Sequence, residues 1–240
     1  MNVASLNVKI FADGASLDEM IQTYKKLHFV RGFTTNPTLM RKAGVTDYET
    51  FARQVIAAIP DRPISFEVFS DDFYEMERQA VHIGSWGDNV YVKIPVSNTA
   101  GESSAPLVAR LAKAGVKQNV TAMMMVEQVR EIARALAGGP SSFVSVFAGR
   151  IADSGRDPLP IMRASLEVIA SEPQIELIWA SPREVLNIVQ AHEIGCHIIT
   201  VTNDLIAKTP TLGKDLHEFS IDTVKMFRSD AVAAGFRLNI

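Results

Sequence analysis

Short apolar runs rich in β-branched residues recur along the 240-residue chain and alternate with amphipathic stretches. Each run is four to seven residues long, which suits a buried strand, and the stretches between them repeat their apolar residues at helical spacing. Strands that alternate with helices in this way form parallel sheets. The predicted strands cover residues 8–12, 32–35, 64–69, 90–96, 116–121, 143–147, 175–180 and 197–202.

Capping residues mark several of the intervening helices. Ser16, Asp47 and Ser181 stand before helical patterns and are predicted N-caps, and another helix is expected to begin around Asp71. The sequence also predicts a final helix over residues 215–234, whose apolar residues have no obvious surface of this chain left to cover.

Eight strand–helix units of about 30 residues predict a (β/α)8 TIM barrel with an additional C-terminal helix. A doubly wound open sheet is the alternative, but it favours a glycine-rich phosphate turn after the first strand, and Asp13-Gly14-Ala15-Ser16 is not one. Because no low-complexity linker divides the chain, we expect one barrel domain over residues 1–240. The extra helix, residues 215–235, is then available for oligomerisation.

Composition narrows the class of partner. The chain is 47% hydrophobic and 21% charged with a formal net charge of -3, which fits a soluble globular protein and gives no electrostatic reason to expect nucleic acid or a membrane. We therefore expect a small-molecule substrate. The single cysteine, Cys196, excludes an internal disulfide, and the N-terminal stretch has no secretory pattern, which favours the cytoplasm. The five histidines form no metal-ligand pattern, so we predict no metal and no cofactor.

The strand predicted over residues 90–96 carries one lysine, Lys93, among apolar residues. Burial disfavours a charged ammonium and so favours the neutral amine that attacks carbonyl groups. The alternative is that Lys93 extends its charge to a rim or pairs with a buried carboxylate. The strand alone leaves both interpretations open.

The active sites of TIM barrels lie at the C-terminal ends of the strands. Polar residues at those ends would supply an amine nucleophile, two carboxylates for proton transfer, amides and hydroxyls for a polyol, and two arginines for a phosphate. Taken singly, each carboxylate is also consistent with a helix cap, and Arg183 with a solvated side chain. The set comprises Asp13, Asn36, Glu67, Lys93, Asn119, Thr121, Ser145, Arg150, Ser181, Arg183 and Asn203.

Motifs from the first strand to the loop after the seventh resemble, in order, those of the transaldolase family. They are Phe11-Ala12-Asp13, Gly32-Phe33-Thr34-Thr35-Asn36-Pro37, Tyr91-Val92-Lys93-Ile94-Pro95, Asn119-Val120-Thr121, Phe147-Ala148-Gly149-Arg150-Ile151 and Ala180-Ser181-Pro182-Arg183. The length and the extra helix are similar to the short subfamily that includes the fructose-6-phosphate aldolases. The resemblance implies that this helix packs across a neighbouring subunit in a homo-oligomer built from rings, often a decamer of two pentamers.

The resemblance also implies an activity: transfer of a dihydroxyacetone unit from a ketose phosphate to an aldose phosphate, as in the pentose phosphate pathway. Lys93 would form the Schiff base, Asp13 would take the proton of the C4 hydroxyl, and Glu67 with Thr121 and a water would relay protons. Substrate-binding roles would fall to Thr35, Asn36, Asn119, Ser145 and Phe147, and phosphate binding to Arg150, Ser181 and Arg183.

Two positions bear on the reaction type. Glu67 and Phe147 match true transaldolases, whereas the fructose-6-phosphate aldolases have a glutamine and a tyrosine there, so the resemblance favours transfer over a Schiff-base lyase. Pro182 replaces an aromatic residue usual in the family, and Glu184 follows Arg183. A non-phosphate anion such as a sulfonate therefore stays open. A binding protein without chemistry is the third alternative, against which the costly buried lysine argues.

Overall fold

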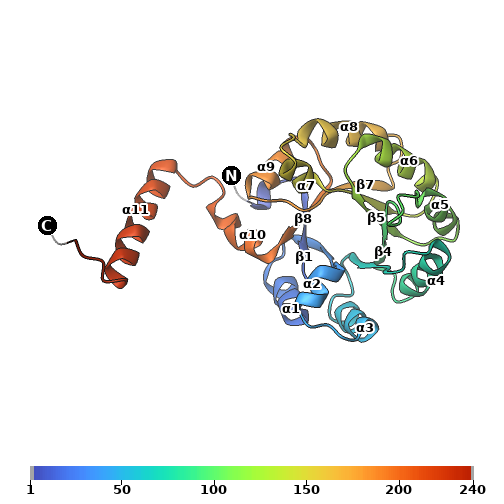
Figure 1. Ribbon diagram of the computed structural model, residues 1–240, viewed down its shortest axis with the longest axis horizontal. Coiled ribbons are helices and arrows are strands. Elements are labelled where there is room, and N and C mark those ends of the chain that lie inside the picture. The colour runs from blue at the N-terminus through green and yellow to red at the C-terminus, as the bar shows by residue number, and fades with distance from the viewer. Residues whose placement is uncertain (1–2, 239–240) are drawn as a thin grey trace.

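Eight parallel strands close into a barrel in the computed structural model, which describes residues 3–238. Each strand pairs with the next in the chain, and β8 pairs with β1, so the predicted TIM barrel is confirmed (Figure 1). The strands are β1 (Lys9–Asp13), β2 (Val30–Thr34), β3 (Ile64–Glu67), β4 (Val90–Pro95), β5 (Gln118–Met123), β6 (Ser142–Val146), β7 (Ile175–Trp179) and β8 (Ile198–Thr202).

Helices surround the barrel, as the alternating pattern predicts, and only the last, α11, stands away from it among the described helices (Figure 1). They are α1 (Leu17–Lys26), α2 (Pro37–Lys42), α3 (Tyr48–Ala58), α4 (Phe73–Gly84), α5 (Ala105–Lys113), α6 (Val126–Leu136), α7 (Ala148–Asp153), α8 (Leu159–Ile169), α9 (Leu186–Glu193), α10 (Asn203–Lys208) and α11 (Leu216–Ala233), with short 3-10 turns at Val3–Ser5 and Thr209–Thr211. The pattern of apolar residues does not predict α2, α7 and α10, because each has six residues and six residues make less than two helical turns.

Two of the predicted helix caps are confirmed. The Ser16 hydroxyl accepts the Glu19 N–H of α1, and the Asp47 carboxylate accepts the Thr50 N–H of α3. The helix expected to begin around Asp71 is α4, which begins at Phe73 with Asp72 as its N-cap.

The prediction of Ser181 as an N-cap is wrong. The helix α9 begins at Leu186, and Ser181 has a φ of 60°, in the left-handed region rather than the extended conformation of an N-cap. Val185 occupies the N-cap position without a side-chain cap, and the Asn187 side-chain oxygen accepts the N–H groups of Arg183 and Glu184 in the loop before the helix.

Aromatic side chains fill the N-terminal half of the barrel interior. Phe11, Tyr91 and Phe143 are buried there, with Tyr91 and Phe143 stacked at 4.1 Å between ring centroids. Gly32 permits this packing, because a Cβ at that position would lie 2.5 Å from the Phe11 ring. The filled end leaves the C-terminal end of the barrel as the place where inward-pointing polar residues can line a cavity.

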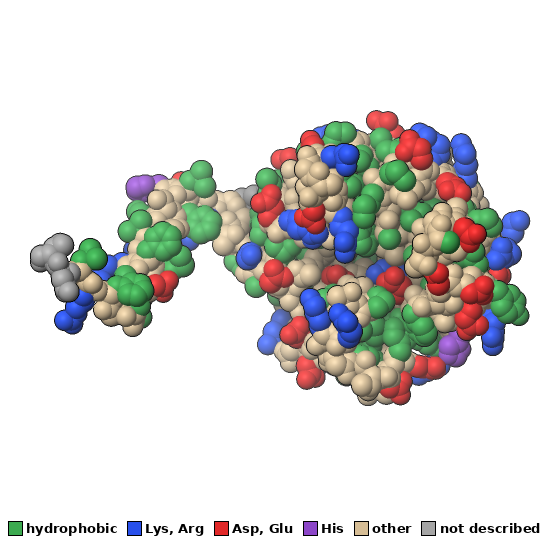
Figure 2. All heavy atoms as spheres, viewed as in Figure 1, with side chains coloured by type: hydrophobic (Ala, Val, Ile, Leu, Met, Phe, Trp, Pro, Cys, Tyr) green, Lys and Arg blue, Asp and Glu red, His purple; other side chains and the backbone are tan. Residues whose placement is uncertain are grey.

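The C-terminal helix α11 contributes no buried residue and stands apart from the barrel in Figure 1. Apolar side chains gather along it in Figure 2. The α11 residues Phe219, Val224 and Phe227 are 43%, 63% and 63% exposed. The structure thus agrees with the sequence in leaving these side chains without a covering surface in their own chain. Within residues 3–238, no helix is both long and apolar enough to cross a membrane.

Candidate active site

A cavity of about 390 Å³ opens at the C-terminal ends of the strands. The barrel face turned to the viewer in Figure 2 is hollowed at its centre, where acidic and basic side chains meet. Ten of the thirteen residues predicted for the site or for the strand ends around it line this cavity; Thr35, Arg183 and Asn203 do not, and Asn203 Nδ2 instead donates to Glu19 Oε2 at 2.7 Å. The ten are Asp13, Asn36, Glu67, Lys93, Asn119, Thr121, Ser145, Phe147, Arg150 and Ser181.

Lys93 lies on β4 with its side chain 9% exposed. Its Nζ is 3.0 Å from Glu67 Oε2 and donates a 2.8 Å hydrogen bond to the Thr35 carbonyl oxygen. The register of β3 and β4 sets Glu67 directly beside Lys93, so this pair follows from strand alignment. Pairing with a carboxylate, one of the two interpretations of the sequence, is therefore what the structure shows. The pair still faces the cavity, and Glu67 is placed to take the proton that Nζ must lose before it attacks a carbonyl.

Thr35 contacts the site through its main-chain carbonyl group and not through its side chain. Its hydroxyl donates to the Ser65 carbonyl oxygen at 2.8 Å, outside the cavity, while its own carbonyl accepts from Lys93. The preceding residue, Thr34, lines the cavity instead, because successive side chains of a strand point to opposite faces.

Asp13 ends β1 and is held by two neighbours. The Thr34 hydroxyl donates to Asp13 Oδ1 at 2.8 Å, and Asn36 Nδ2 donates to Oδ2 at 3.3 Å. Burial raises the pKa of this carboxyl above its usual value, although the Lys93 charge and both hydrogen bonds act in the opposite direction. A raised pKa brings the group closer to neutral pH, where a base that later returns its proton is most effective.

Thr34 and Thr200 are cavity residues that the motif analysis missed. Their hydroxyl oxygens lie 2.5 Å apart, so the hydrogen bonds that hold the Asp13 carboxylate continue from Thr34 on β2 to Thr200 on β8. A sequence signal existed, because Thr34 ends the buried run Gly32-Phe33-Thr34 and Thr200 interrupts the apolar run of β8. The register gives it weight: β1 pairs Asp13 with Thr34 and Phe11 with Thr200.

A chain of hydrogen bonds crosses the cavity wall from β6 to β3. Ser145 Oγ donates to Asn119 Oδ1 at 2.7 Å, and Asn119 Nδ2 donates to Ser65 Oγ at 3.0 Å. Thr121 Oγ1 is buried without a hydrogen-bond partner among the described residues. A hydroxyl in that position is left to bond a substrate or water in the cavity, since an unpaired buried polar group costs about 1–3 kcal/mol.

The far end of the cavity is formed by α7 and the loop after β7. Gly149 brings these two segments together, because a Cβ there would lie 1.5 Å from the Ser181 carbonyl oxygen. Arg150 lines this end with its guanidinium 6.0 Å from the centroid of the Phe147 ring. The guanidinium makes no hydrogen bond to a described residue, so its donors are available to an anion.

Arg183 lies outside the cavity in a bidentate ion pair. Its Nε and Nη2 donate to the two carboxylate oxygens of Asp153 at 2.8 and 2.5 Å, and Nη1 donates to Ser181. The Asp153 carboxylate raises the pKa of the Arg183 guanidinium, and Arg183 lowers the pKa of Asp153. Motif spacing gave no hint of Asp153, which is 30 residues away in the chain.

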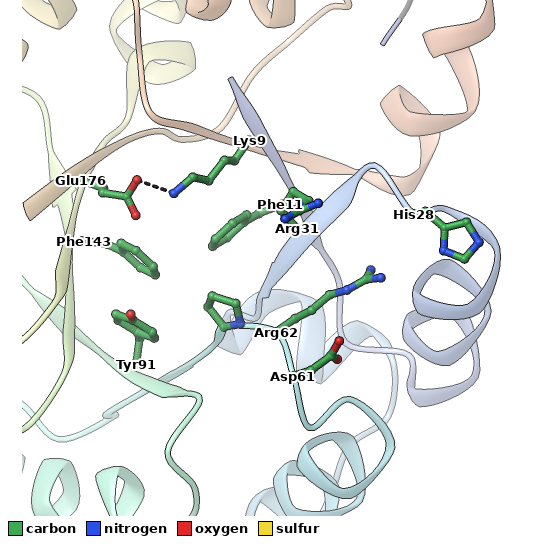
Figure 3. A pocket seen from close by; sticks show the side chains of 10 residues that line it. Lys9, Phe11, His28, Arg31, Asp61, Arg62, Tyr91, Phe143 and Glu176 are labelled. Carbon is green, nitrogen blue, oxygen red and sulfur yellow. Dashed lines mark hydrogen bonds and ion pairs between the residues drawn. The ribbon is translucent and has the colours of Figure 1, made fainter. Parts of the chain in front are cut away.

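A second cavity of about 370 Å³ lies at the N-terminal end of the barrel, over the aromatic layer (Figure 3). An ion pair between Lys9 and Glu176 spans it at 2.6 Å. The Lys9 side chain is 47% exposed, so this amine lacks the enclosure of Lys93. A buried amine beside carboxyl groups that can exchange protons is found in the C-terminal cavity, and we therefore place the candidate active site there. Among the described residues, no three His, Cys, Asp or Glu side chains gather as a metal site requires.

Known proteins share sequence with most of this chain. The sequence pattern of the transaldolase/fructose-6-phosphate aldolase family matches residues 10–238. A probable transaldolase of Dehalococcoides mccartyi is 36% identical over 195 residues, which are 81% of this chain and 86% of that protein. A probable transaldolase of Thermoanaerobacter is 32% identical over 232 residues, or 96% of this chain and 100% of that protein.

Solved structures share the fold at low identity. A protein described as QR15, an aldolase, superposes with a TM-score of 0.55 at 12% identity, covering 82% of this chain and 91% of its own. The 3-keto-L-gulonate-6-phosphate decarboxylase of Vibrio cholerae gives a TM-score of 0.55 at 12% identity, over 82% and 88% of the two chains. These likenesses support the barrel architecture alone.

Proposed function

The chain belongs to the transaldolase/fructose-6-phosphate aldolase family, and from that premise we propose that it transfers a three-carbon dihydroxyacetone unit from a ketose phosphate to an aldose phosphate through a Schiff base on Lys93. The observation that carries the proposal is the enclosed Lys93 amine, 3.0 Å from Glu67 and in one cavity with Asp13. A nucleophile and two carboxylates in one small cavity are the groups that a Schiff-base carbon transfer requires.

Schiff-base formation uses Lys93 and Glu67. Glu67 takes a proton from Nζ, and the free amine attacks the C2 carbonyl of the ketose to give a carbinolamine. Loss of water from the carbinolamine needs a proton on the departing hydroxyl, which Glu67 returns. The Thr121 hydroxyl, buried and without a protein partner among the described residues, helps to carry that proton.

Carbon transfer uses Asp13. The protonated imine accepts the electron pair of the C3–C4 bond as Asp13 removes the proton of the C4 hydroxyl, so an aldose phosphate leaves and a three-carbon enamine stays on Lys93. The enamine then attacks the aldehyde carbon of the acceptor, and Asp13 returns its proton to the new hydroxyl. Hydrolysis of the new imine releases the product ketose and restores the amine.

Substrate contacts divide between the two ends of the cavity. Asn36, Asn119 and Ser145 are placed near Lys93 and Asp13 and would hold the hydroxyls of the dihydroxyacetone unit. Arg150 and Ser181 line the far end and would hold the phosphate of the sugar.

Reductive trapping tests the proposal. Incubation with fructose 6-phosphate and borohydride reduces an imine to a stable amine, which mass spectrometry of a proteolytic digest locates on the chain. We expect a three-carbon or hexose adduct on Lys93. Absence of any adduct with a series of phosphorylated ketoses would refute a Schiff-base enzyme for those donors.

Simple aldol cleavage is the alternative reaction, and Phe147 is the residue that favours transfer. Net cleavage needs a proton on the enamine carbon, and the Phe147 ring at the cavity wall cannot position one. We expect Phe147→Tyr to raise acceptor-free cleavage of fructose 6-phosphate by about tenfold, less than the roughly 10²–10⁴-fold of a fully positioned proton donor. Release of glyceraldehyde 3-phosphate, followed in a coupled assay, measures it. Phe147→Leu serves as the control without a hydroxyl, and equal rates in the two variants would count against the explanation.

We propose further that residues 1–240 act as one barrel domain in a homo-oligomer, with α11 packed on a neighbouring copy. The proposal is supported by the exposed apolar side chains of α11, which need a partner surface in water. Rings of five and decamers are the assemblies that the family resemblance implies.

Truncation tests this assembly. A protein ending at Lys214 is expected to elute from size exclusion with a smaller mass by light scattering, because the apolar surface that joins the copies is lost. The full-length Val224→Ser/Phe227→Ser variant is the matched control for loss of apolar contacts alone. An unchanged mass for both proteins would show that α11 does not hold the assembly together.

A further inference from the structure

Ser181 is held in an unfavourable backbone conformation at the far end of the cavity. Its φ of 60° lies in the left-handed region, which a residue with a Cβ adopts at a penalty of about 1–2 kcal/mol. Strain of this kind persists only where neighbouring groups impose it. The question is which group does so here and what the conformation achieves.

Arg183 is that group. Its Nη1 donates to both the carbonyl oxygen and the hydroxyl oxygen of Ser181 at 2.9 Å, so one nitrogen makes two hydrogen bonds to the serine. Gly149 lies against the same carbonyl, since a Cβ there would be 1.5 Å from the Ser181 oxygen and 3.3 Å from Arg183 Cζ. Ser181 is therefore held by contacts with both α7 and Arg183.

The contact with Arg183 determines which way the hydroxyl proton of Ser181 can point. A guanidinium can only donate, so Ser181 Oγ is the acceptor in its bond to Arg183. Its own O–H is left to donate elsewhere, and Ser181 lines the cavity. The contact with Arg183 thus prepares the serine as a hydrogen-bond donor toward a ligand.

Asp153 in turn holds Arg183. Two charge-assisted hydrogen bonds join the Arg183 guanidinium to the Asp153 carboxylate, and two more join it to Ser181, which occupies four of its five N–H groups. The carboxylate also neutralises the arginine. Arg150 keeps its N–H donors free of described protein partners at this end of the cavity, while its charge also acts on Asp153.

We propose that Asp153 is a positioning residue: through Arg183 it fixes Ser181 so that the serine hydroxyl donates to the anionic end of the substrate, beside Arg150. Arg183 then supports the anion site from outside rather than binding the anion itself. The inference rests on the proposed function for the identity of that anion as a sugar phosphate.

The test compares Asp153→Asn, Ser181→Ala and the double variant. Isothermal titration with glyceraldehyde 3-phosphate should show about tenfold weaker binding for each single variant, the loss expected for one charge-assisted hydrogen bond. The double variant should be no weaker than Ser181→Ala, because both changes remove the same contact. In turnover, KM for the phosphorylated acceptor should rise by the same factor with kcat unchanged, and KM for unphosphorylated glyceraldehyde should stay the same.

Other outcomes overturn the inference. Tighter binding by Asp153→Asn would show that Arg183, once released, binds the anion directly, and additive losses in the double variant would show that the two residues act separately. An equal loss with both acceptors would indicate a merely structural role. Glu184→Gln is the matched control, since it removes one negative charge beside Arg183 without a side-chain contact to it. The titration needs no turnover, so it tests Asp153 even if the trapping experiment shows no Schiff base.

Discussion

Lys93→Met is expected to lower the rate of dihydroxyacetone transfer by on the order of 10⁴-fold or more, as in enzymes that lose a covalent nucleophile. Methionine has nearly the length of lysine, so the variant keeps the volume on β4 while it removes the amine. Without the amine no imine forms, and the C3–C4 electron pair has no acceptor. A coupled assay of transfer from fructose 6-phosphate to an aldose phosphate measures the rate, and borohydride should trap no adduct.

The matched control is Lys9→Met, the same change on a strand lysine at the opposite end of the barrel. Lys9 pairs with Glu176 at the exposed mouth, so its loss should leave transfer and trapping intact. Circular dichroism must show native helix content for both variants, because Lys93→Met leaves Glu67 without its counter-charge. Transfer by a folded Lys93→Met protein within about tenfold of the wild-type rate would refute the covalent mechanism.

The barrel and most of its site could be predicted because strand order alone places them. Once eight strands follow one another in a closed parallel barrel, their C-terminal ends meet at one rim. Asp13 and Glu67 end the observed β1 and β3, and Lys93 lies two residues before the end of β4, so their meeting follows from the strands without the loops. The boundaries of the predicted strands differ from the observed ones by one or two residues at most ends, which leaves this argument unchanged.

The far end of the cavity was less predictable because loops build it. Ser181 looks like a helix cap in sequence, since serine before an amphipathic stretch usually is one. Its left-handed backbone depends on Arg183 and on contact with Gly149 of another segment, and neither has a local signal. Asp153 reaches Arg183 only through the packing of α7 on the loop after β7. Long-range pairs of this kind are fixed by the fold rather than by spacing.

Lys93 shows a different limit of sequence reasoning. A buried nucleophile and a lysine paired with a carboxylate were alternatives when β4 was considered alone. The β3–β4 register makes them compatible, since Glu67 is at once the counter-charge of Lys93 and a base within reach of its proton. The alternatives could not be separated before the neighbouring strand was known.

Asp13→Asn is expected to lower transfer by about 10²–10⁴-fold, the contribution of a positioned general base, while imine formation on Lys93 continues. Borohydride should therefore trap the intact hexose phosphate on the variant, where the wild type also yields the three-carbon fragment. Mass spectrometry of the Lys93 peptide distinguishes the two. A three-carbon adduct on Asp13→Asn at the wild-type level would show that another group takes the C4 proton.

The Asp13→Asn change is also expected to stabilise the fold, by an amount that increases with pH. Burial raises the pKa of Asp13 above its ordinary value of 3.8. Below that value the carboxyl is protonated in both folded and unfolded states, and it adds no pH-dependent penalty. As pH rises through the raised pKa of the folded state, the native protein must ionise a buried carboxyl and loses stability relative to the unfolded chain.

Asparagine removes that penalty and can keep both neighbours. Its amide nitrogen can donate to Thr34 Oγ1, whose proton then turns to Thr200, while its oxygen still accepts from Asn36. Urea unfolding should give Asp13→Asn an advantage of about 1 kcal/mol at pH 8, the usual scale for relieving a strained active-site group, and a smaller one as the pH falls toward the ordinary pKa of 3.8. An advantage that grows on acidification would contradict the raised pKa. A stable variant that forms the hexose imine but does not break the C3–C4 bond would separate the role of Asp13 in catalysis from any role in folding.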